Sequence, residues 1–341
     1  MCNDANIFAH YKLRLRFNVE SLVGIGMEIF KDEVVQNLVD HLRNSLRRNV
    51  ISTRKDSSLS APRFVFVCGK KIAEEEESIR GYTMKKLNMQ KVQNDYGSEY
   101  GTVLCIISEY LYIQDLAEDI FVFEKMLAEI SDKIIIITES PGTFCELGAF
   151  VMDEQCRKKT VVINENNENF KSSFITRGPI KLLENEHPDR VILHNGLERI
   201  KESLEYNYKV QQIANEEFSI NINKDANEIH LKSLIYELTN IIELFQPIEP
   251  YEVEYLYKGL KKFSSYQIHN TAGHKIRTIK QVLFLMEKMK LVRKEKGYYF
   301  INNGMSCYNV MFSISRKEFN QIRIEYLNRL NNCKSERMDI L

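Results

Sequence analysis

The chain has 341 residues, of which 44% are hydrophobic and 28% charged, and its formal net charge is zero. This composition excludes a disordered chain, and the length exceeds the roughly 100 to 200 residues of a typical domain, so we expect two domains. No apolar run reaches the roughly 18 residues that span a bilayer, and the first residues lack the order of a signal peptide, which predicts a cytoplasmic protein.

Charge is distributed unevenly along the chain. Residues 251–341 contain 17 Lys and Arg against 8 Asp and Glu, whereas the rest contains 30 against 39. The basic C-terminal part indicates either an anionic partner or a surface whose cations only face water. The seven cysteines are scattered without a CxxC pair and the histidines lack the spacing of metal ligands, so we expect neither disulfides nor a metal site.

Residues 1–60 are predicted to form a helical segment, because apolar residues from Ile29 to Leu42 recur at helical spacing. A polar linker follows before Pro62. The segment contains no recognisable chemistry, and it would either cover the sheet or mediate a contact between subunits.

Residues 61–218 alternate short apolar runs with longer helical patterns. Strands are predicted at 63–68, 102–107, 133–138, 160–163 and 190–193, and helices at 116–130, 144–157 and 197–214. Continuous apolar strands separated by helices are typical of a parallel sheet with helices on both faces. The predicted fold class is therefore α/β.

Residues 228–341 are predicted to form a second domain. Helices are expected at 230–245, 253–263 and 278–290, then a hairpin within 291–300 and a final helix at 316–330. Three helices followed by a hairpin are typical of a winged helix-turn-helix.

The loop after the third predicted strand is the most informative segment. It reads ESPGTFCELG over residues 139–148 and opens a helix. Ligands of open α/β sheets bind at the carboxyl ends of strands, and free N–H groups at a helix start attract anions. Gly142 offers backbone angles and a close approach that other residues do not. Glu146 would lie near the positive end of the helix, which favours its ionised form.

A purely structural interpretation of the same residues stays open. Thr143 and Glu146 have the spacing of a capping box, in which the glutamate only accepts a hydrogen bond from the backbone at the helix start.

Several segments together resemble a known family. SPGTFCELGAF at residues 140–150 and KSSFITRGPIKLL at 171–183 look like the effector proteins of type II retrons, as do FVFVCG at 64–69, the strand-end acid Glu109 and LAEISD at 127–132. The catalytic domain of these effectors is similar to nucleoside deoxyribosyltransferases, and their C-terminal domain is a winged helix. The resemblance spans residues 63–183, and it covers the C-terminal part only by the order of its elements.

The resemblance implies cleavage of the bond between a ribose carbon and a base nitrogen, in NAD or a related nucleotide. Such a reaction passes through an oxocarbenium-like state and needs a carboxylate beneath the sugar. Glu146 matches the catalytic glutamate of the family. The residues expected to receive ribose or phosphate are Gly69, Glu109, Ser140, Pro141, Gly142 and Thr143.

Hydrolysis is expected rather than transfer to a second base. Deoxyribosyltransferases commonly carry an aspartate in the loop before the catalytic helix, where this chain has Glu139-Ser140. Glu139 is a further acid at a strand end, and Arg177 could reach a phosphate, although both would also suit exposed positions. The nucleotide would be a substrate, and no cofactor is expected.

The basic residues of the C-terminal part suit contacts with phosphates or with a protein partner. They are Lys275, Arg277, Lys280, Arg293, Lys294 and Lys296. The family resemblance implies that a reverse transcriptase with its multicopy RNA–DNA product holds a toxic enzyme inactive until phage infection. It also implies a homo-oligomer or a larger nucleoprotein assembly. The rival hypothesis is a nucleotide-sensing, DNA-binding regulator without catalysis.

Overall fold

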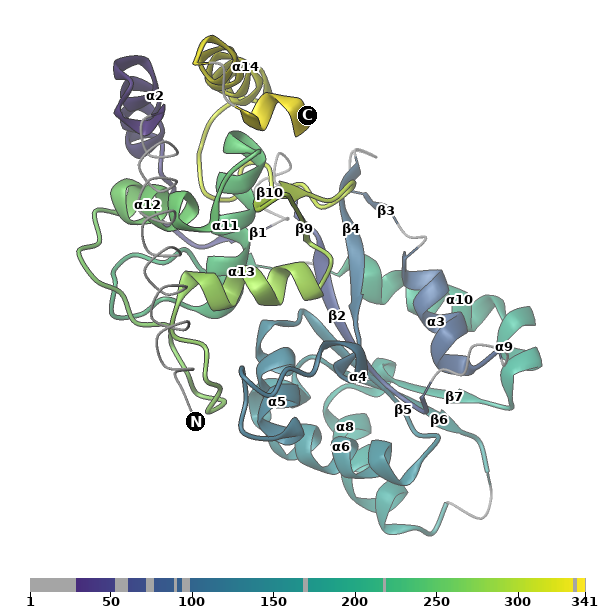
Figure 1. Cartoon of the computed structure of the whole chain (residues 1–341). Helices are drawn as coiled ribbons and strands as arrows, with labels where there is room; N and C mark the ends of the chain where they lie inside the picture. The colour runs from purple at the N-terminus through teal and green to yellow at the C-terminus, as the bar shows by residue number, and fades with distance from the viewer. Residues whose placement is uncertain are drawn as a thin grey trace, which may run out of the picture.

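The computed structural model describes residues 29–52, 61–71, 77–88, 91–93, 99–167, 171–216, 219–333 and 336–340. A six-stranded sheet forms the centre of one half of the molecule, in the order β3-β4-β2-β5-β6-β7 (Figure 1). Five strands are parallel: β2 (Arg63–Cys68), β4 (Glu99–Ile106), β5 (Lys133–Ile137), β6 (Thr160–Glu165) and β7 (Val191–His194). The edge strand β3 (Lys91–Gln93) pairs antiparallel with β4. The predicted α/β class and parallel sheet are confirmed.

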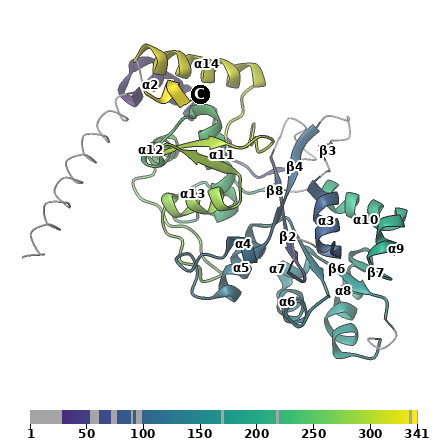
Figure 2. The same cartoon turned by 45° about the vertical axis from the view of Figure 1, so that its right-hand side comes forward.

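Helices cover both faces of this sheet (Figure 2). On one face lie α3 (Ile79–Asn88), α9 (Leu197–Glu202) and α10 (Leu204–Asn215), which pack on alternate strand residues such as Val65, Ile135 and Val161. On the other lie α5 (Ile120–Ile130), α6 (Pro141–Met152), α7 (Glu154–Arg157) and α8 (Lys181–Glu186), in the same cluster as Phe66 and Ile134. Both faces are buried, which explains why the strands read as continuous apolar runs.

The predicted helices and hairpin of the C-terminal part are also present. They are α11 (Leu231–Phe245), α12 (Pro250–Lys261), α13 (Ile279–Lys288), β9 (Val292–Glu295), β10 (Tyr298–Ile301) and α14 (Arg316–Asn332). A short bridge between Ile248 and Tyr299 adds a third backbone segment beside the hairpin.

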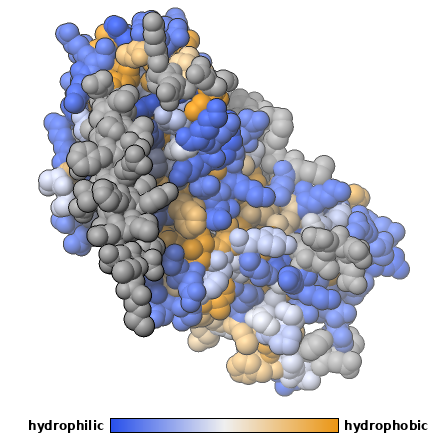
Figure 3. All heavy atoms as spheres, viewed as in Figure 1, coloured by the Kyte–Doolittle hydropathy of each residue, from blue (hydrophilic) through white to orange (hydrophobic). Residues whose placement is uncertain are grey.

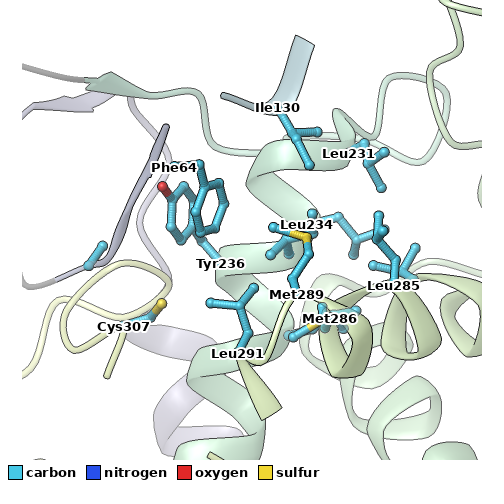
Figure 4. Close-up of a cluster of buried hydrophobic side chains, with 14 of the residues drawn as sticks. Phe64, Ile130, Leu231, Leu234, Tyr236, Leu285, Met286, Met289, Leu291 and Cys307 are labelled. Atoms are coloured by element: carbon cyan, nitrogen blue, oxygen red, sulfur yellow. The ribbon is translucent and has the colours of Figure 1, made fainter. Parts of the chain in front are cut away.

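One helix joins the two parts. Fourteen side chains of α11 are buried, and Tyr236 stacks on Phe64 of β2 with ring centroids 4.9 Å apart (Figure 4). The Tyr236 hydroxyl also donates to the carbonyl of Pro62 at 2.8 Å. Residues of the sheet, α5, α11 and α13 therefore share one hydrophobic cluster. The division into units 61–218 and 228–341 stays a prediction.

The described part of the N-terminal segment packs on the C-terminal helices. Helix α2 (Glu33–Asn44) begins at Asp32, whose carboxylate accepts from the N–H groups of Val34 and Val35. It lies against α12 and α14, and Phe30 just before it stacks on Tyr326 of α14. This part does not cover the sheet, and residues 1–28 and 53–60 lie outside the described ones.

The visible surface in Figure 3 is mostly hydrophilic, with apolar residues gathered near its centre and its lower end. Within the described residues no helix is long and apolar enough to cross a membrane. No cluster of three or more His, Cys, Asp or Glu side chains in the described ranges could hold a metal ion.

Candidate active site

The candidate site lies where the strand order reverses. From β2 the chain crosses to β4 on one side, and it then returns to β5 on the other side of β2. The carboxyl ends of these three strands lead into Gly69, the short helix α4 (Ser108–Leu111) and the start of α6. In open α/β sheets, this reversal point leaves a crevice between loops that diverge in opposite directions. The sequence-predicted residues Gly69, Glu109 and Ser140 therefore reach the same edge.

Helix α6 begins earlier than predicted, and this frees Glu146 from a capping role. Ser140 is the N-cap: its hydroxyl accepts from the N–H of Thr143 at 3.4 Å, and the Thr143 hydroxyl accepts from the N–H of Ser140 at 3.1 Å. Pro141 occupies the first turn, where its missing N–H costs nothing. The capping box between Thr143 and Glu146 is therefore wrong, because Ser140 and Thr143 form it instead.

Glu146 faces a second carboxylate, Glu124 of α5. Burial and then the negative charge of Glu124 raise the pKa of Glu146 to about 7. Oε2 of Glu146 is buried and has no hydrogen-bond partner among the described residues. Burial likewise raises the pKa of Glu124. The expectation that the helix start keeps Glu146 ionised is wrong, because desolvation and like charge outweigh the helix dipole. Burial therefore disfavours the ionised form of both carboxyl groups, and the two titrate as an interacting pair.

A fixed ion pair borders this carboxyl pair. Arg80 of α3 donates to both oxygens of Glu109, with its Nη2 2.9 Å from Oε2, and its Nη2 also donates to the carbonyl of Val67 at 2.6 Å. Burial opposes ionisation of Glu109, but the hydrogen bonds and charge of Arg80, together with hydrogen bonds from the backbone and from Ser108, outweigh it, so the pKa of Glu109 lies below its ordinary value. Ser108 lies between the ion pair and Glu124, because its hydroxyl donates to Glu124 at 2.8 Å and lies 3.4 Å from Oε2 of Glu109.

The two glycines of the site have roles that differ from those predicted. A Cβ on Gly69 would lie 2.8 Å from Cδ of Arg80, so this glycine makes room for the arginine rather than only for a ligand. Gly142 has no positive φ, and a Cβ there would meet only the Ser140 hydroxyl of the described residues, at 3.8 Å. The special backbone angles predicted for Gly142 are wrong, whereas the space above it is open.

Glu139 and Arg177 lie apart from the carboxyl pair. Glu139 lines a separate hollow of about 220 Å³ with Lys70, Lys71 and Leu197, on the α3 and α9 side of the sheet edge. Arg177 is exposed in a helical turn at Thr176–Ile180, and no hydrogen bond or ion pair among the described residues joins it to Glu146.

Sequence reasoning missed Arg80, Ser108 and Glu124. Arg80 is only 1% exposed, whereas arginines usually lie on the surface. Glu124 stands beside Lys125 in a mostly apolar helix, and its position gave no reason to single it out. Only the fold brings these residues to Glu146.

The six predicted docking residues are all exposed. Arg293 lies over the ring of Phe300 and Lys294 over that of Tyr299, while Lys296 forms the hairpin turn with φ 48°. Lys275 pairs with Glu118 at 3.4 Å, so its charge is partly neutralised. Tyr299 and Phe300 are buried.

The fold and the site define an α/β protein with a carboxyl pair at the reversal point of a parallel sheet. Residues 76–294 match the family model described as STM3845 retron effector protein, and the chain belongs to this family. The predicted resemblance to retron effectors is confirmed at this level.

Two relatives from Escherichia coli have names that point to the same class. The chain is 27% identical over 246 residues to the "Retron Ec86 putative ribosyltransferase/DNA-binding protein", a match that covers 67% of this chain and 77% of that relative. It is 30% identical over 122 residues to the corresponding Retron Ec73 protein, covering 36% of this chain and 38% of that relative.

Proposed function

We propose that this retron effector is an N-glycosidase that cleaves the ribose–base bond of NAD or a related nucleotide, with Glu146 as the catalytic carboxylate. The observation that supports it most is the half-buried carboxyl group of Glu146 at the reversal point of the sheet, which lies near Glu124 and has one buried oxygen without a hydrogen-bond partner among the described residues. Glycosidases of most families use two carboxyl groups, one ionised and one protonated, at the scissile bond. The names of the relatives, which include ribosyltransferase, agree with chemistry at a ribose.

With NAD, the bond between the ribose anomeric carbon and the pyridine nitrogen breaks, and its electron pair stays on the nicotinamide, which leaves neutral without an acid. The ionised carboxylate of Glu146 stabilises the developing positive charge or bonds to the anomeric carbon. Water then completes hydrolysis at that carbon, and Glu124 accepts its proton. A cationic substrate favours the ionised form of Glu146, whose pKa of about 7 would otherwise leave it half protonated.

The start of α6 supplies the candidate binding wall. Ser140, Pro141, Gly142 and Thr143 form its first turn, where open N–H groups and the helix dipole favour a phosphate or a ribose hydroxyl. The open space above Gly142 would let a ligand approach this backbone closely. Glu109, held by Arg80, would accept hydrogen bonds from ribose.

The C-terminal part is proposed to be a winged helix that docks on the retron reverse transcriptase and its multicopy RNA–DNA product, which would hold the toxic enzyme inactive. Its three helices, its hairpin and the bridge at Tyr299 support this assignment, as do the exposed cations of α13 and the hairpin. The relatives' names include DNA-binding. A pull-down from cells containing the whole retron should recover both reverse transcriptase and nucleic acid, and recovery of neither would contradict this part.

The test of catalysis is release of a free base. Wild type and Glu146→Gln are incubated with NAD, NADP, ATP and deoxynucleosides, and the products are separated by chromatography. Glu154→Gln is a matched control, because Glu154 is a glutamate in the exposed helix that follows α6. Release of base by wild type and Glu154→Gln but not by Glu146→Gln supports the proposal. Expression of wild type or Glu154→Gln should likewise be toxic to cells, whereas expression of Glu146→Gln should be harmless.

Full activity of Glu146→Gln would overturn the assignment. Tight binding of an unchanged nucleotide, together with sequence-specific DNA binding, would favour a regulator without catalysis.

A further inference from the structure

A second feature lies on the helical part, away from the carboxyl pair. A hollow of about 390 Å³ opens between the end of α2, the end of α12 and the turn at residues 223–224. No acidic residue of the described chain lines it, whereas six cations do: Arg43, Arg47, Arg48, Lys224, Lys261 and Lys262. This basic hollow contains none of the six docking residues predicted around α13 and the hairpin.

Part of this positive charge is compensated within the protein. Lys261 donates to the fully buried Glu237 at 2.5 Å, and Arg43 pairs with Asp40. Arg48, Lys224 and Lys262 are exposed, and none of the ion pairs among the described residues includes them. Three segments that are distant in sequence thus place three uncompensated cations around one hollow.

Helix ends explain only some of these cations. The carboxyl end of a helix attracts Lys and Arg, which accounts for Arg43 and Lys261 in the last turns of α2 and α12. Arg48 lies beyond the C-cap of α2, and Lys224 belongs to neither helix. Lys262 ends α12 with φ 59°, a conformation that glycine adopts more easily than lysine.

We propose that the basic hollow binds phosphates of a DNA backbone, as a contact additional to the winged helix. A cluster of exposed cations that form no ion pair among the described residues is the chemistry that holds a phosphodiester chain. No aromatic side chain lines the hollow among the described residues, so it offers no platform for stacking bases. The contact is therefore to phosphates and carries no sequence information. The inference rests on the DNA-binding part of the proposed function and is independent of Glu146.

The test measures affinity for a fluorescein-labelled 20-base-pair duplex of arbitrary sequence by anisotropy, over a range of KCl concentrations. The variant Arg48→Gln/Lys224→Gln/Lys262→Gln should bind at least about tenfold more weakly, and the salt slope of its affinity should fall by about 2 to 3, roughly one for each lost phosphate contact. Because the three side chains are exposed, the variant should keep the melting temperature of wild type.

The matched control is Lys158→Gln/Lys181→Gln/Arg199→Gln, which removes the same charge from exposed positions of the α/β part. It should bind within about twofold of wild type. Equal binding by the two triple variants, or no duplex binding by wild type, would overturn the inference. Release of a free base by both triple variants is measured in parallel. Duplex affinity then tests the DNA contact, and base release tests the glycosidase proposal, so the failure of one is distinguished from the failure of the other.

Discussion

Glu146→Gln should stabilise the protein at alkaline pH. The raised pKa, about 7 against an ordinary 4.5, means that burial and Glu124 disfavour the ionised form. The difference in pKa corresponds to at most about 3 kcal/mol in the free energy of unfolding. Partial exposure of Glu146 and its interaction with Glu124 reduce the expected effect to about 1 to 2 kcal/mol. The pKa of Glu146 is higher in the folded than in the unfolded state, so protonation of this group stabilises the fold of wild type. This stabilisation is fully present below pH 4.5 and is lost as the pH rises through about 7. Glutamine keeps the shape and removes the charge.

Melting temperatures of wild type and Glu146→Gln, measured from pH 5 to pH 8.5, test this reasoning. The two proteins should melt together at pH 5 and separate by a few degrees at pH 8.5, with the variant higher. Glu154→Gln is a control for which the pH dependence of stability should have the opposite sign, because the hydrogen bond and charge of Lys158 lower the pKa of Glu154. A difference between wild type and Glu146→Gln that does not change with pH would refute the reasoning.

Three further changes probe the site. Glu124→Gln removes a like charge and should lower the pKa of Glu146, so the acid limb of the kcat/KM profile should move to lower pH. Gly69→Ala places a Cβ 2.8 Å from Arg80, and it should lower both the melting temperature and the nucleotide affinity, measured by thermal unfolding and calorimetry. Ser140→Ala removes the N-cap of α6 and should cost about 1 kcal/mol in urea unfolding.

Each of these changes has an outcome that contradicts it. Gly142→Ala is the control for the melting temperature of Gly69→Ala, because its Cβ would have open space within the protein, and an equal loss of melting temperature in both would contradict the crowding argument. An unchanged pH profile in Glu124→Gln would show that the two carboxyl groups are not coupled. A Ser140→Ala variant as stable as wild type would show that the cap contributes little.

The parallel strands were predictable because residues buried on both faces leave a continuous apolar run. Helix interruptions were less visible. The helix predicted at 197–214 is divided at Ser203, whose hydroxyl caps α10 by accepting from Tyr206 at 3.1 Å. The helix predicted at 144–157 is divided at Asp153, which caps α7. Both caps are short polar residues inside apolar periodicity, where the periodic pattern hides them.

The candidate site was also predictable only in part. Glu146 was predictable because it follows a strand and a loop of turn residues within a few positions. Glu124 and Arg80 come from helices on opposite faces of the sheet, and helix α3 itself was not predicted, since Gly81 interrupts its periodicity. The pKa of Glu146 depends on burial and on Glu124, which no spacing in the sequence expresses.

The stack of Phe64 on Tyr236 connects the amino end of β2 to α11, and the carboxyl end of the same strand leads to Gly69 beside Arg80. Protein interiors are close-packed, so α11 cannot shift alone without opening a void beneath the ring. A partner that moves the helical part would therefore also displace β2, whose other end leads to the candidate site.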